Sequence, residues 1–283
     1  MSKLLFNKIC VVGVGLIGGS VALAVKKRML ARVVVGVARR KKTIEEALEK
    51  KAINIGTLDL KRGVEGADLV ILAGPVSTIV GQIKTLSRSL DKKTVVIDVG
   101  SSKEKIEQAA KKYLKKNIFV GCHPMAGLEK KGVLFAEPDL FEGAVCFMTG
   151  RHARVEAFWR ALGCVPTRID AHEHDAWVAQ FSHLPHVLAF TLFQKSPHRP
   201  GSLKASNPSL RDLARISKSD PRLWSDIFFS NRSELLSAIA HFQKDLRGLE
   251  NALRSRQLAR VIAYIRKANH ISRRLAPNVD HRD

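Results

Sequence analysis

Residues 8–18 read Lys-Ile-Cys-Val-Val-Gly-Val-Gly-Leu-Ile-Gly, and this stretch decides the fold. The apolar residues before the first glycine are typical of a buried strand, and small residues at helical spacing follow as far as Arg28. The glycines match the G-x-G-x-x-G turn: the first permits a tight turn, the second lets the backbone approach a pyrophosphate, and the third lets helix and strand pack closely. The turn therefore predicts a dinucleotide site rather than a glycine-rich connection without a ligand. Its predicted cofactor contacts are Gly13, Gly15, Leu16, Ile17 and Gly18.

The residues after the second predicted strand, 32–37, indicate which dinucleotide binds. NAD-specific turns place an Asp or Glu there to accept hydrogen bonds from the ribose hydroxyls. This chain instead has Arg39 and Arg40, followed by two lysines. Guanidinium groups bind a 2′-phosphate, which a carboxylate would repel. We therefore expect NADP, with Arg39 and Arg40 as contacts, and keep NAD or a merely solvated basic loop as the alternatives.

Strands and helices alternate up to about residue 169, which predicts an α/β fold with a Rossmann-type, doubly wound parallel sheet. Further predicted strands are 67–73, 94–99, 117–121 and 144–149. Ser77 is a predicted N-cap for the helix that follows the first of these strands. Later in the chain the predicted helices are 174–195, 222–248 and 249–275. We therefore expect a dinucleotide-binding domain over 1–169 and an all-helical domain over 170–283.

The composition is that of a folded protein with a strong positive charge. Apolar residues make up 45% of the 283 residues, and the formal net charge is +22. The basic residues are spread over both halves without interleaved aromatic side chains, so we expect a solvated surface that attracts anionic ligands and no nucleic-acid partner. No apolar run approaches the roughly 18 residues of a membrane span, so no membrane is expected. The four cysteines form no C-x-x-C pair, and we expect free thiols in a reducing cytoplasm.

Three predicted strands lead into residues suited to binding or catalysis, and in this architecture ligands bind at the carboxyl ends of strands. Pro75, Ser101 and His123 follow these strands, the last within the segment His-Pro-Met-Ala-Gly. A histidine held by a neighbouring proline is a suitable general base, because its pKa lies near working pH. Taken alone, His123 is equally well explained as a loop histidine.

Two polar segments interrupt the apolar helices of the second half. Residues 182–186 read Ser-His-Leu-Pro-His, and the two histidines, three apart, share a helix face. No third ligand accompanies them, so we expect no metal. Residues 211–221 contain Arg215, which either pairs with a nearby aspartate or binds a substrate carboxylate.

Taken together and in order, these segments resemble the prephenate dehydrogenase family, which includes the arogenate and cyclohexadienyl dehydrogenases. The resemblance covers nearly the whole chain. It rests on residues 13–18, 100–103, 123–127, 182–186, 212–221 and 224–227.

The resemblance implies an oxidative decarboxylation in tyrosine biosynthesis. The substrate is prephenate, which yields 4-hydroxyphenylpyruvate, or its amino analogue arogenate, which yields tyrosine. Hydride leaves C4 of the ring for NADP or NAD while the 4-hydroxyl loses its proton. Carbon dioxide then departs and the ring becomes aromatic. The resemblance also implies that the helical domain binds substrate and forms a homodimer.

Position by position, the resemblance assigns roles to the site residues. His123 matches the catalytic histidine that accepts the hydroxyl proton, and Ser101 matches a serine that orients this histidine and the nicotinamide. Arg215 matches an arginine that binds the ring carboxylate. The other substrate contacts that the resemblance assigns are His186, Ser182 and Glu129.

The chain departs from the family pattern in three places. Leu128 stands where Thr or Ser is common, residues 205–210 replace a glycine run, and the ribose-reading acid is absent. A donor such as His186 suits the keto acid of prephenate, so we expect prephenate over arogenate. The alternatives are a related two-domain, NADP-dependent reductase of hydroxyacids or imines and, suggested by charge alone, a nucleic-acid-associated protein.

Overall fold

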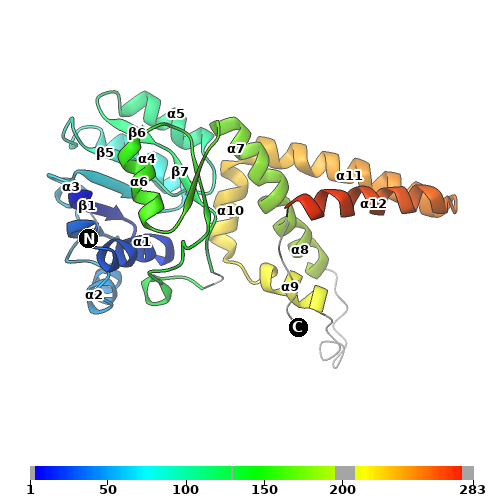
Figure 1. Ribbon diagram of the computed structural model, residues 1–283, viewed down its shortest axis with the longest axis horizontal. Coiled ribbons are helices and arrows are strands. Elements are labelled where there is room, and N and C mark those ends of the chain that lie inside the picture. Colours follow the sequence, from blue (N-terminus) through cyan, green and yellow to red (C-terminus); the bar gives the residue numbers. More distant parts are fainter. Residues whose placement is uncertain (1–3, 129, 195–207, 276–283) are drawn as a thin grey trace. The chain divides into compact units, whose positions relative to one another are not determined.

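The glycine turn joins the first strand of the main sheet to its first helix. The computed structural model describes residues 4–128, 130–194 and 208–275 (Figure 1). Six parallel strands form the main sheet in the order β3-β2-β1-β4-β5-β6. They are β1 (Phe6–Val12), β2 (Ala31–Val37), β3 (Ile55–Thr57), β4 (Leu69–Leu72), β5 (Val95–Asp98) and β6 (Ile118–Val120). Because the strand order reverses between β1 and β4, the ligand crevice lies outside the carboxyl ends of these two strands.

Helices cover both faces of this sheet, which explains the unbroken apolar run in β1. Ile9 and Val11 are buried in one apolar cluster together with residues of α1, while Cys10 and Val12 are buried in a second cluster with residues of α4 and α5. The helices around the sheet are α1 (Leu16–Lys27), α2 (Lys41–Glu49), α3 (Leu60–Val64), α4 (Val76–Leu86) and α5 (Glu104–Tyr113). The predicted α/β class with a doubly wound parallel sheet is therefore confirmed.

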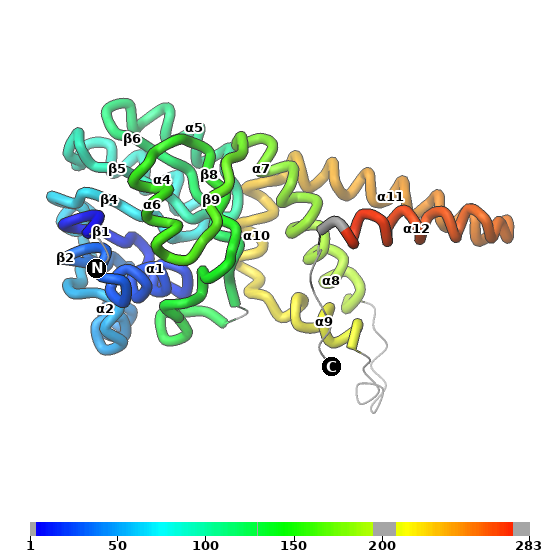
Figure 2. The backbone as a smooth tube through the Cα atoms, viewed as in Figure 1, coloured from blue at the N-terminus to red at the C-terminus, as the bar shows by residue number. Residues whose placement is uncertain are grey.

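A second, smaller sheet, of which β8 and β9 are labelled in Figure 2, carries His123 on its remaining strand. Its strands are β7 (Cys122–Pro124), β8 (Val145–Met148) and β9 (Val165–Arg168), accompanied by a 3-10 turn (Val133–Phe135) and α6 (Ala153–Ala161). β8 pairs antiparallel with β7 and parallel with β9. The predicted strand at 144–149 therefore exists, but it belongs to this sheet and not to the parallel one. Only Gly121 separates β6 from β7, so the chain passes directly from one sheet to the other.

Beyond β9 the described part of the chain is helical, as predicted. The helices are α7 (Ala171–Val178), which continues through a π turn (Ala179–His183) into α8 (Leu184–Gln194), then α9 (Pro208–Ser217), α10 (Pro221–Ser230), α11 (Arg232–Arg254) and α12 (Leu258–Leu275). The predicted break between residues 248 and 249 is wrong. α11 continues through Gly248, and the chain turns at residues 255–257, where Arg256 adopts a left-handed φ of 52°. Among the described residues, no helix is both long and apolar enough to span a membrane.

The chain divides into two compact units after Glu234. The first contains both sheets and the helices up to α10. The second, from Leu235, contains most of α11 and the described part of α12. The predicted domain boundary between residues 169 and 170 stays a prediction.

Candidate active site

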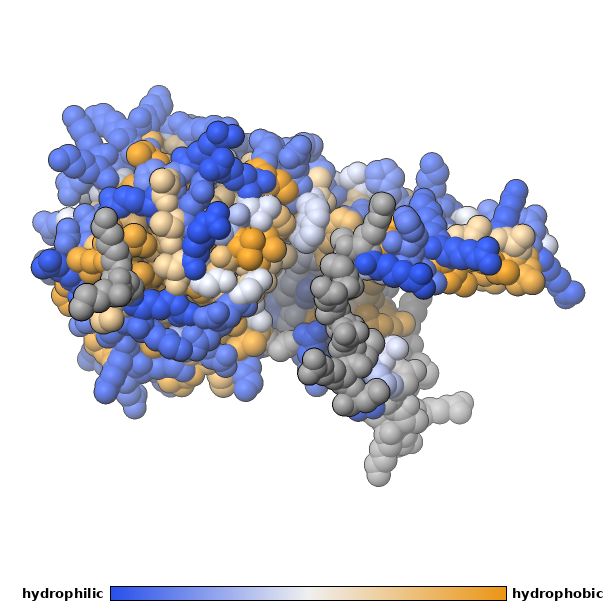
Figure 3. All heavy atoms as spheres, viewed as in Figure 1, coloured by the Kyte–Doolittle hydropathy of each residue, from blue (hydrophilic) through white to orange (hydrophobic). Residues whose placement is uncertain are grey.

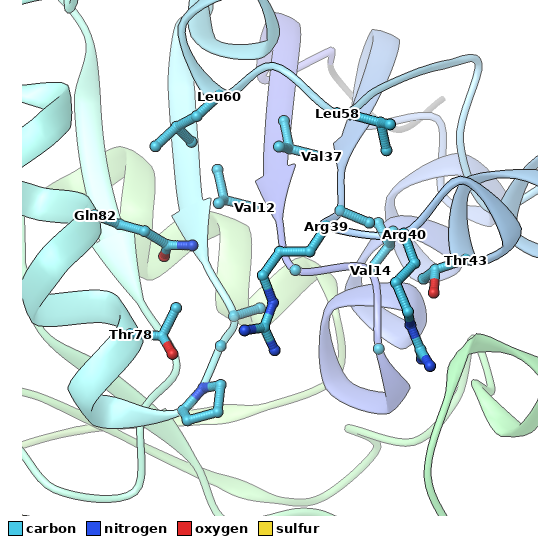
Figure 4. A pocket seen from close by; sticks show the side chains of 16 residues that line it. Val12, Val14, Val37, Arg39, Arg40, Thr43, Leu58, Leu60, Thr78 and Gln82 are labelled. Atoms are coloured by element: carbon cyan, nitrogen blue, oxygen red, sulfur yellow. The ribbon is translucent and has the colours of Figure 1, made fainter.

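A cavity of about 360 Å³ lies at the carboxyl ends of β1, β2 and β4. The glycine turn forms one wall, and the segment after β4, which includes Pro75, forms another. Gly13 has a φ of 102°, and a Cβ on it would lie 2.7 Å from the carbonyl oxygen of Ala73, so the close approach of the two walls requires glycine. Figure 4 shows Arg39 and Arg40 side by side in this cavity, with Arg40 toward Thr43 and Arg39 toward Thr78.

Most of the predicted cofactor residues line a cavity, but Gly18 does not line this one. Gly13, Gly15, Arg39, Arg40 and Pro75 all line this first cavity. The third glycine of the turn does not line it; its hydrogen faces the carbonyl oxygen of the first, where a Cβ would come within 2.1 Å. Its role is therefore to let α1 pack against the turn.

A second cavity, of about 340 Å³, continues from the first past the start of α1. Gly15 and Pro75 line both cavities, and Leu16, Ile17 and Ser101 line the second. Its far wall includes residues of α10. The shared residues make the two cavities one continuous groove.

The start of α4 corrects one prediction. Ser77 is not the N-cap, because the helix begins at Val76 with Pro75 in the capping position and without a side-chain cap. Instead, the backbone N–H of Ser77 faces the carboxylate of Asp226 on α10, 3.4 Å from both oxygens. An acid from a distant helix therefore occupies the place of a local cap.

A third cavity, of about 500 Å³, collects the predicted catalytic and substrate residues. It shares Leu16, Ile17 and Ser101 with the second cavity, so the groove leads into it. The predicted residues that line it are Ser101, His123, Ser182, His186 and Arg215. These side chains come from β7, the loop after β5, the π turn, α8 and α9. Glu129 lies outside the described residues.

His123 is half-buried on β7, and the Nδ1 atom of its ring makes a hydrogen bond. This atom lies 2.9 Å from Nε2 of His174, whose own Nδ1 lies 2.8 Å from Oδ1 of Asp175. Burial lowers the pKa of His123 well below its usual value of 6.5, and the positive charge of the Lys103 ammonium adds to the shift. His123 is therefore neutral at working pH and able to accept a proton.

A buried lysine ties the strand that carries His123 to the rest of the site. The Lys103 ammonium binds the carboxylate of Asp98 and donates to the carbonyl of Cys122 at 2.8 Å, and both charged side chains are fully buried. The backbone N–H of Lys103 donates to Asp175 at 2.7 Å. One residue therefore connects the end of β5, the start of β7 and the middle of α7.

His186 and Arg215 form the other side of the third cavity. The Nδ1 of His186 donates to the carbonyl of Ser182 at 2.9 Å, and its ring stacks on Trp224 with the centroids 3.4 Å apart. Burial lowers the pKa of His186 below 6.5, and the positive charge of Arg215 lowers it further. Only Nε2 of His186 therefore remains for a ligand.

Sequence reasoning missed two residues that build this site, His174 and Asp175, and gave no role to Lys103, although Lys103 ends the segment 100–103 on which the resemblance rests. His174, Asp175 and Lys103 are polar and buried, and their importance depends on contacts made across 70 or so residues of chain. For His174 and Asp175, the sequence signal was limited to two adjacent polar residues within the predicted helix 174–195. Among the described residues, no group of three or more His, Cys, Asp or Glu side chains is arranged to hold a metal ion.

Comparison with known proteins matches two family models to the chain. The model of the prephenate dehydrogenase nucleotide-binding domain matches residues 21–162, and the model of the prephenate dehydrogenase dimerization domain matches residues 170–267. Among curated proteins, prephenate dehydrogenase of Lactococcus lactis is 33% identical, over 85% of this chain and 69% of its own length. Cyclohexadienyl dehydrogenase of Zymomonas mobilis is 30% identical over 98% of both chains.

Solved structures agree with the sequence comparison. Prephenate dehydrogenase of Aquifex aeolicus, in complex with hydroxyphenyl propionate and NAD+, has a TM-score of 0.87 and 29% identity, covering 95% of this chain and 98% of its own. Arogenate dehydrogenase of Synechocystis has a TM-score of 0.80 and 26% identity, covering 95% of this chain and 99% of its own. Similarity therefore extends over both family models and nearly the full length of the chain.

Proposed function

The chain belongs to the prephenate dehydrogenase family, and we propose that it acts on prephenate in preference to arogenate, with NADP as the hydride acceptor. It is a nicotinamide-dependent dehydrogenase that oxidatively decarboxylates prephenate or arogenate in tyrosine biosynthesis. One observation carries the finer proposal: the groove that begins at Arg39 and Arg40 ends at the cavity that holds His123 and Arg215.

The residues of the groove fit a nicotinamide dinucleotide. A Cβ on Gly15 would meet nothing within 4 Å, so the backbone there is open to a pyrophosphate. The bound dinucleotide supplies the acceptor for the hydride from C4 of the substrate ring. Arg39 and Arg40 lie where a 2′-phosphate would need positive charge, and their wall of the cavity carries no carboxylate.

In the proposed mechanism His123 takes the proton of the 4-hydroxyl as hydride leaves C4. Ser101, which lines both the second and the third cavity, orients His123 and the nicotinamide. The carbonyl that forms at C4 is conjugated to the carbon that bears the ring carboxylate, so carbon dioxide departs and the ring becomes aromatic. Arg215 holds that carboxylate by a charge-assisted pair of hydrogen bonds.

The remaining assigned residues surround the substrate side chain. Ser182 and His186 line the cavity from the π turn and α8, and we assign them to the side chain of the substrate. Glu129 lies outside the described residues and stays a proposed substrate contact. Leu128 lines the second and third cavities where many relatives have a hydroxyl, so this wall offers the substrate an apolar contact.

The preference for prephenate is supported by the curated relatives. Two of the proteins with 29% identity or more carry the name prephenate dehydrogenase, and a third carries the broader name cyclohexadienyl dehydrogenase. His186 supports prephenate only in its protonated form. The keto oxygen of prephenate needs a hydrogen-bond donor, whereas neutral Nε2 of His186 is an acceptor, which suits the ammonium of arogenate.

The cofactor preference is tested by steady-state kinetics with both dinucleotides. We expect a higher kcat/KM with NADP than with NAD, and Arg39→Ala and Arg40→Ala should each lower kcat/KM for NADP by about 10- to 100-fold, the value of a hydrogen bond to a charged group. Their kcat/KM with NAD should change little, because NAD has no 2′-phosphate. Lys42→Ala is the matched control, since Lys42 is exposed and near Glu46, outside the cavity. A higher kcat/KM with NAD in the unmodified enzyme would show that the proposal is wrong.

We also propose that the protein is a homodimer. The match to a dimerization domain supports it, and so do the exposed apolar residues of the second compact unit.

We propose further that the protein functions in a reducing cytoplasm. All four cysteines are free and buried, which supports this location: Cys10, Cys122, Cys146 and Cys164.

A further inference from the structure

Three side chains stand in line behind the catalytic cavity. His123 on β7, His174 on α7 and Asp175, the next residue, are joined by contacts of 2.9 Å and 2.8 Å. The side chains of His174 and Asp175 are fully buried, and neither residue lines the cavity. Of the three residues, only His123 lines the cavity and can contact the substrate.

The direction of the hydrogen bonds follows from Asp175. An ionised carboxylate only accepts hydrogen bonds, and this one accepts the backbone N–H groups of Lys103 at 2.7 Å and Glu104 at 3.0 Å. Its contact with Nδ1 of His174 therefore requires a proton on that nitrogen. A neutral His174 then has a bare Nε2, which can only accept a hydrogen bond. The proton between the two histidines must consequently lie on Nδ1 of His123.

We propose that His174 and Asp175 are positioning residues that hold His123 in the tautomer with Nδ1 protonated, so that its Nε2 is bare and ready to accept the hydroxyl proton of the substrate. This inference rests on the proposed role of His123 as the base. It adds that the base works only because two buried residues on α7 fix which of its nitrogens carries the proton.

The charges around His123, His174 and Asp175 agree with a neutral His174 and with the proposed tautomer of His123. Burial lowers the pKa of His174 below 6.5, and the Lys103 ammonium opposes a second positive charge there, so His174 is neutral. His183, on the π turn, is also neutral because burial lowers its pKa to about 4. The two acids facing the group are Asp175 and Asp98, and the latter is paired with Lys103.

The hydrogen-bonded side chains of His123, His174 and Asp175 also stabilise the product of proton transfer. When the hydroxyl proton moves to Nε2, His123 becomes an imidazolium that still donates through Nδ1 to His174. The Asp175 carboxylate, one ring further on, stabilises this positive charge across His174. No proton needs to leave His174, and His123 returns to its neutral form by releasing the proton from Nε2 through the cavity.

His174→Phe is the central variant. Phenylalanine keeps a ring against Phe147, whose centroid lies 5.6 Å from that of His174, but cannot accept the Nδ1 proton of His123. We expect kcat to fall by about 100-fold, within the range of losses when a general base is impaired, with KM and the cofactor Kd within about threefold. His174→Gln retains an acceptor and should keep kcat within about tenfold of the unmodified enzyme. His172→Phe, on the exposed side of the same helix, is the matched control and should have little effect.

The tautomer itself is read by nitrogen NMR of histidine-labelled protein, with His123→Asn used to assign the signal. The expected result is a protonated Nδ1 and a bare Nε2 in the unmodified enzyme and in His174→Gln, and loss of this pattern in His174→Phe. A bare Nδ1 in the unmodified enzyme would overturn the proposal, and this measurement does not depend on any His174 variant folding. Unchanged kcat in a folded His174→Phe would overturn it as well.

The failure of this inference is distinguishable from the failure of the proposed function. If His123→Asn retains full activity, His123 is not the base and the proposed mechanism fails, whatever its tautomer. If His123→Asn is inactive while His174→Phe is as active as the unmodified enzyme, the mechanism stands and the positioning role fails.

Discussion

At the residue scale, His123 and Arg215 line the same cavity but are expected to affect different kinetic parameters. His123→Asn removes the base and should lower kcat by about 10²- to 10⁴-fold, with little change in the cofactor Kd. Arg215→Ala removes a contact that substrate and transition state share, so it should mainly raise KM. Steady-state kinetics and dinucleotide titration separate the two. A kcat that hardly moves in His123→Asn, or an Arg215→Ala change confined to kcat, would contradict the assigned roles.

We expect His186 to make the choice between the two ring substrates depend on pH. Its pKa is held below 6.5 by burial and by Arg215, so the neutral form prevails above that pH and the donor form gains as pH falls. We therefore expect the ratio of kcat/KM for prephenate to that for arogenate to rise, by about threefold or more, between about pH 7.5 and about pH 5.5. His123 stays competent over part of this range because its own pKa is well below 6.5.

The matched variant for this test is His186→Gln, which cannot titrate. Its substrate ratio should be independent of pH, while that of the unmodified enzyme changes. A ratio that falls with decreasing pH in the unmodified enzyme would show that His186 does not contact the side chain of the substrate.

At the scale of elements, we expect two substitutions in the glycine turn to affect different properties, one the stability of the fold and the other the affinity for the dinucleotide. A Cβ on Gly18 would lie 2.1 Å from the Gly13 carbonyl oxygen and 3.0 Å from side chains of β1 and the segment after β4. Gly18→Ala should therefore lower the free energy of unfolding by about 1–3 kcal/mol, as overpacking of a core does. A Cβ on Gly15 meets nothing within 4 Å, so Gly15→Ala should fold normally but bind the dinucleotide more weakly.

Thermal unfolding and dinucleotide titration of both variants check this prediction. The expected pattern is a lower Tm for Gly18→Ala and an unchanged Tm with a raised cofactor Kd for Gly15→Ala. Equal affinity in Gly15→Ala and the unmodified protein would show that the pyrophosphate does not approach the turn at this residue.

Strands with a strong apolar pattern were predictable, including β6 with three residues, and strands without one were not. The runs Ile9–Val12 of β1, Leu69–Leu72 of β4 and Val95–Ile97 of β5 are buried on both faces of the sheet, so these runs are apolar without a break. β3, β7 and β9 have three or four residues each, and the last two contain a proline, so tertiary pairing and not local preference makes them strands. The turn after α11 lacks a glycine, whereas Gly248 lies inside the helix, and the predicted break followed the glycine.

The site residues also divide into those with a recognisable sequence pattern, which were predictable, and those without one. Ser101, His123, His186 and Arg215 lie in recognisable segments, and the structure brings all four to one cavity. His174 and Asp175 lack such a signal, because their function depends on what α7 packs against. A residue that acts through a neighbour is visible only once the fold has placed that neighbour.

At the scale of the whole molecule, the second compact unit carries the exposed apolar residues that we expect to form the interface of the proposed homodimer. In α12, Leu258, Ile262 and Ile265 lie at helical spacing on one face, and all three are exposed. α11 adds exposed Leu246 and Leu253. Figure 3 shows apolar residues gathered along these helices. Apolar faces of this kind are typical of protein–protein interfaces, and the match to a dimerization domain covers both helices as far as residue 267.

The double variant Ile262→Glu with Ile265→Glu is expected to abolish dimerisation, because an interface that buries unpaired carboxylates is strongly disfavoured. Light scattering should give about twice the 31.3 kDa of one chain for the unmodified protein and a single-chain mass for the variant. The control is Arg260→Glu with Lys267→Glu, which adds acids to the opposite face of α12 and should leave the mass unchanged. Far-ultraviolet circular dichroism shows whether both variants keep their helices. A single-chain mass for the unmodified protein at micromolar concentration would contradict the proposed homodimer.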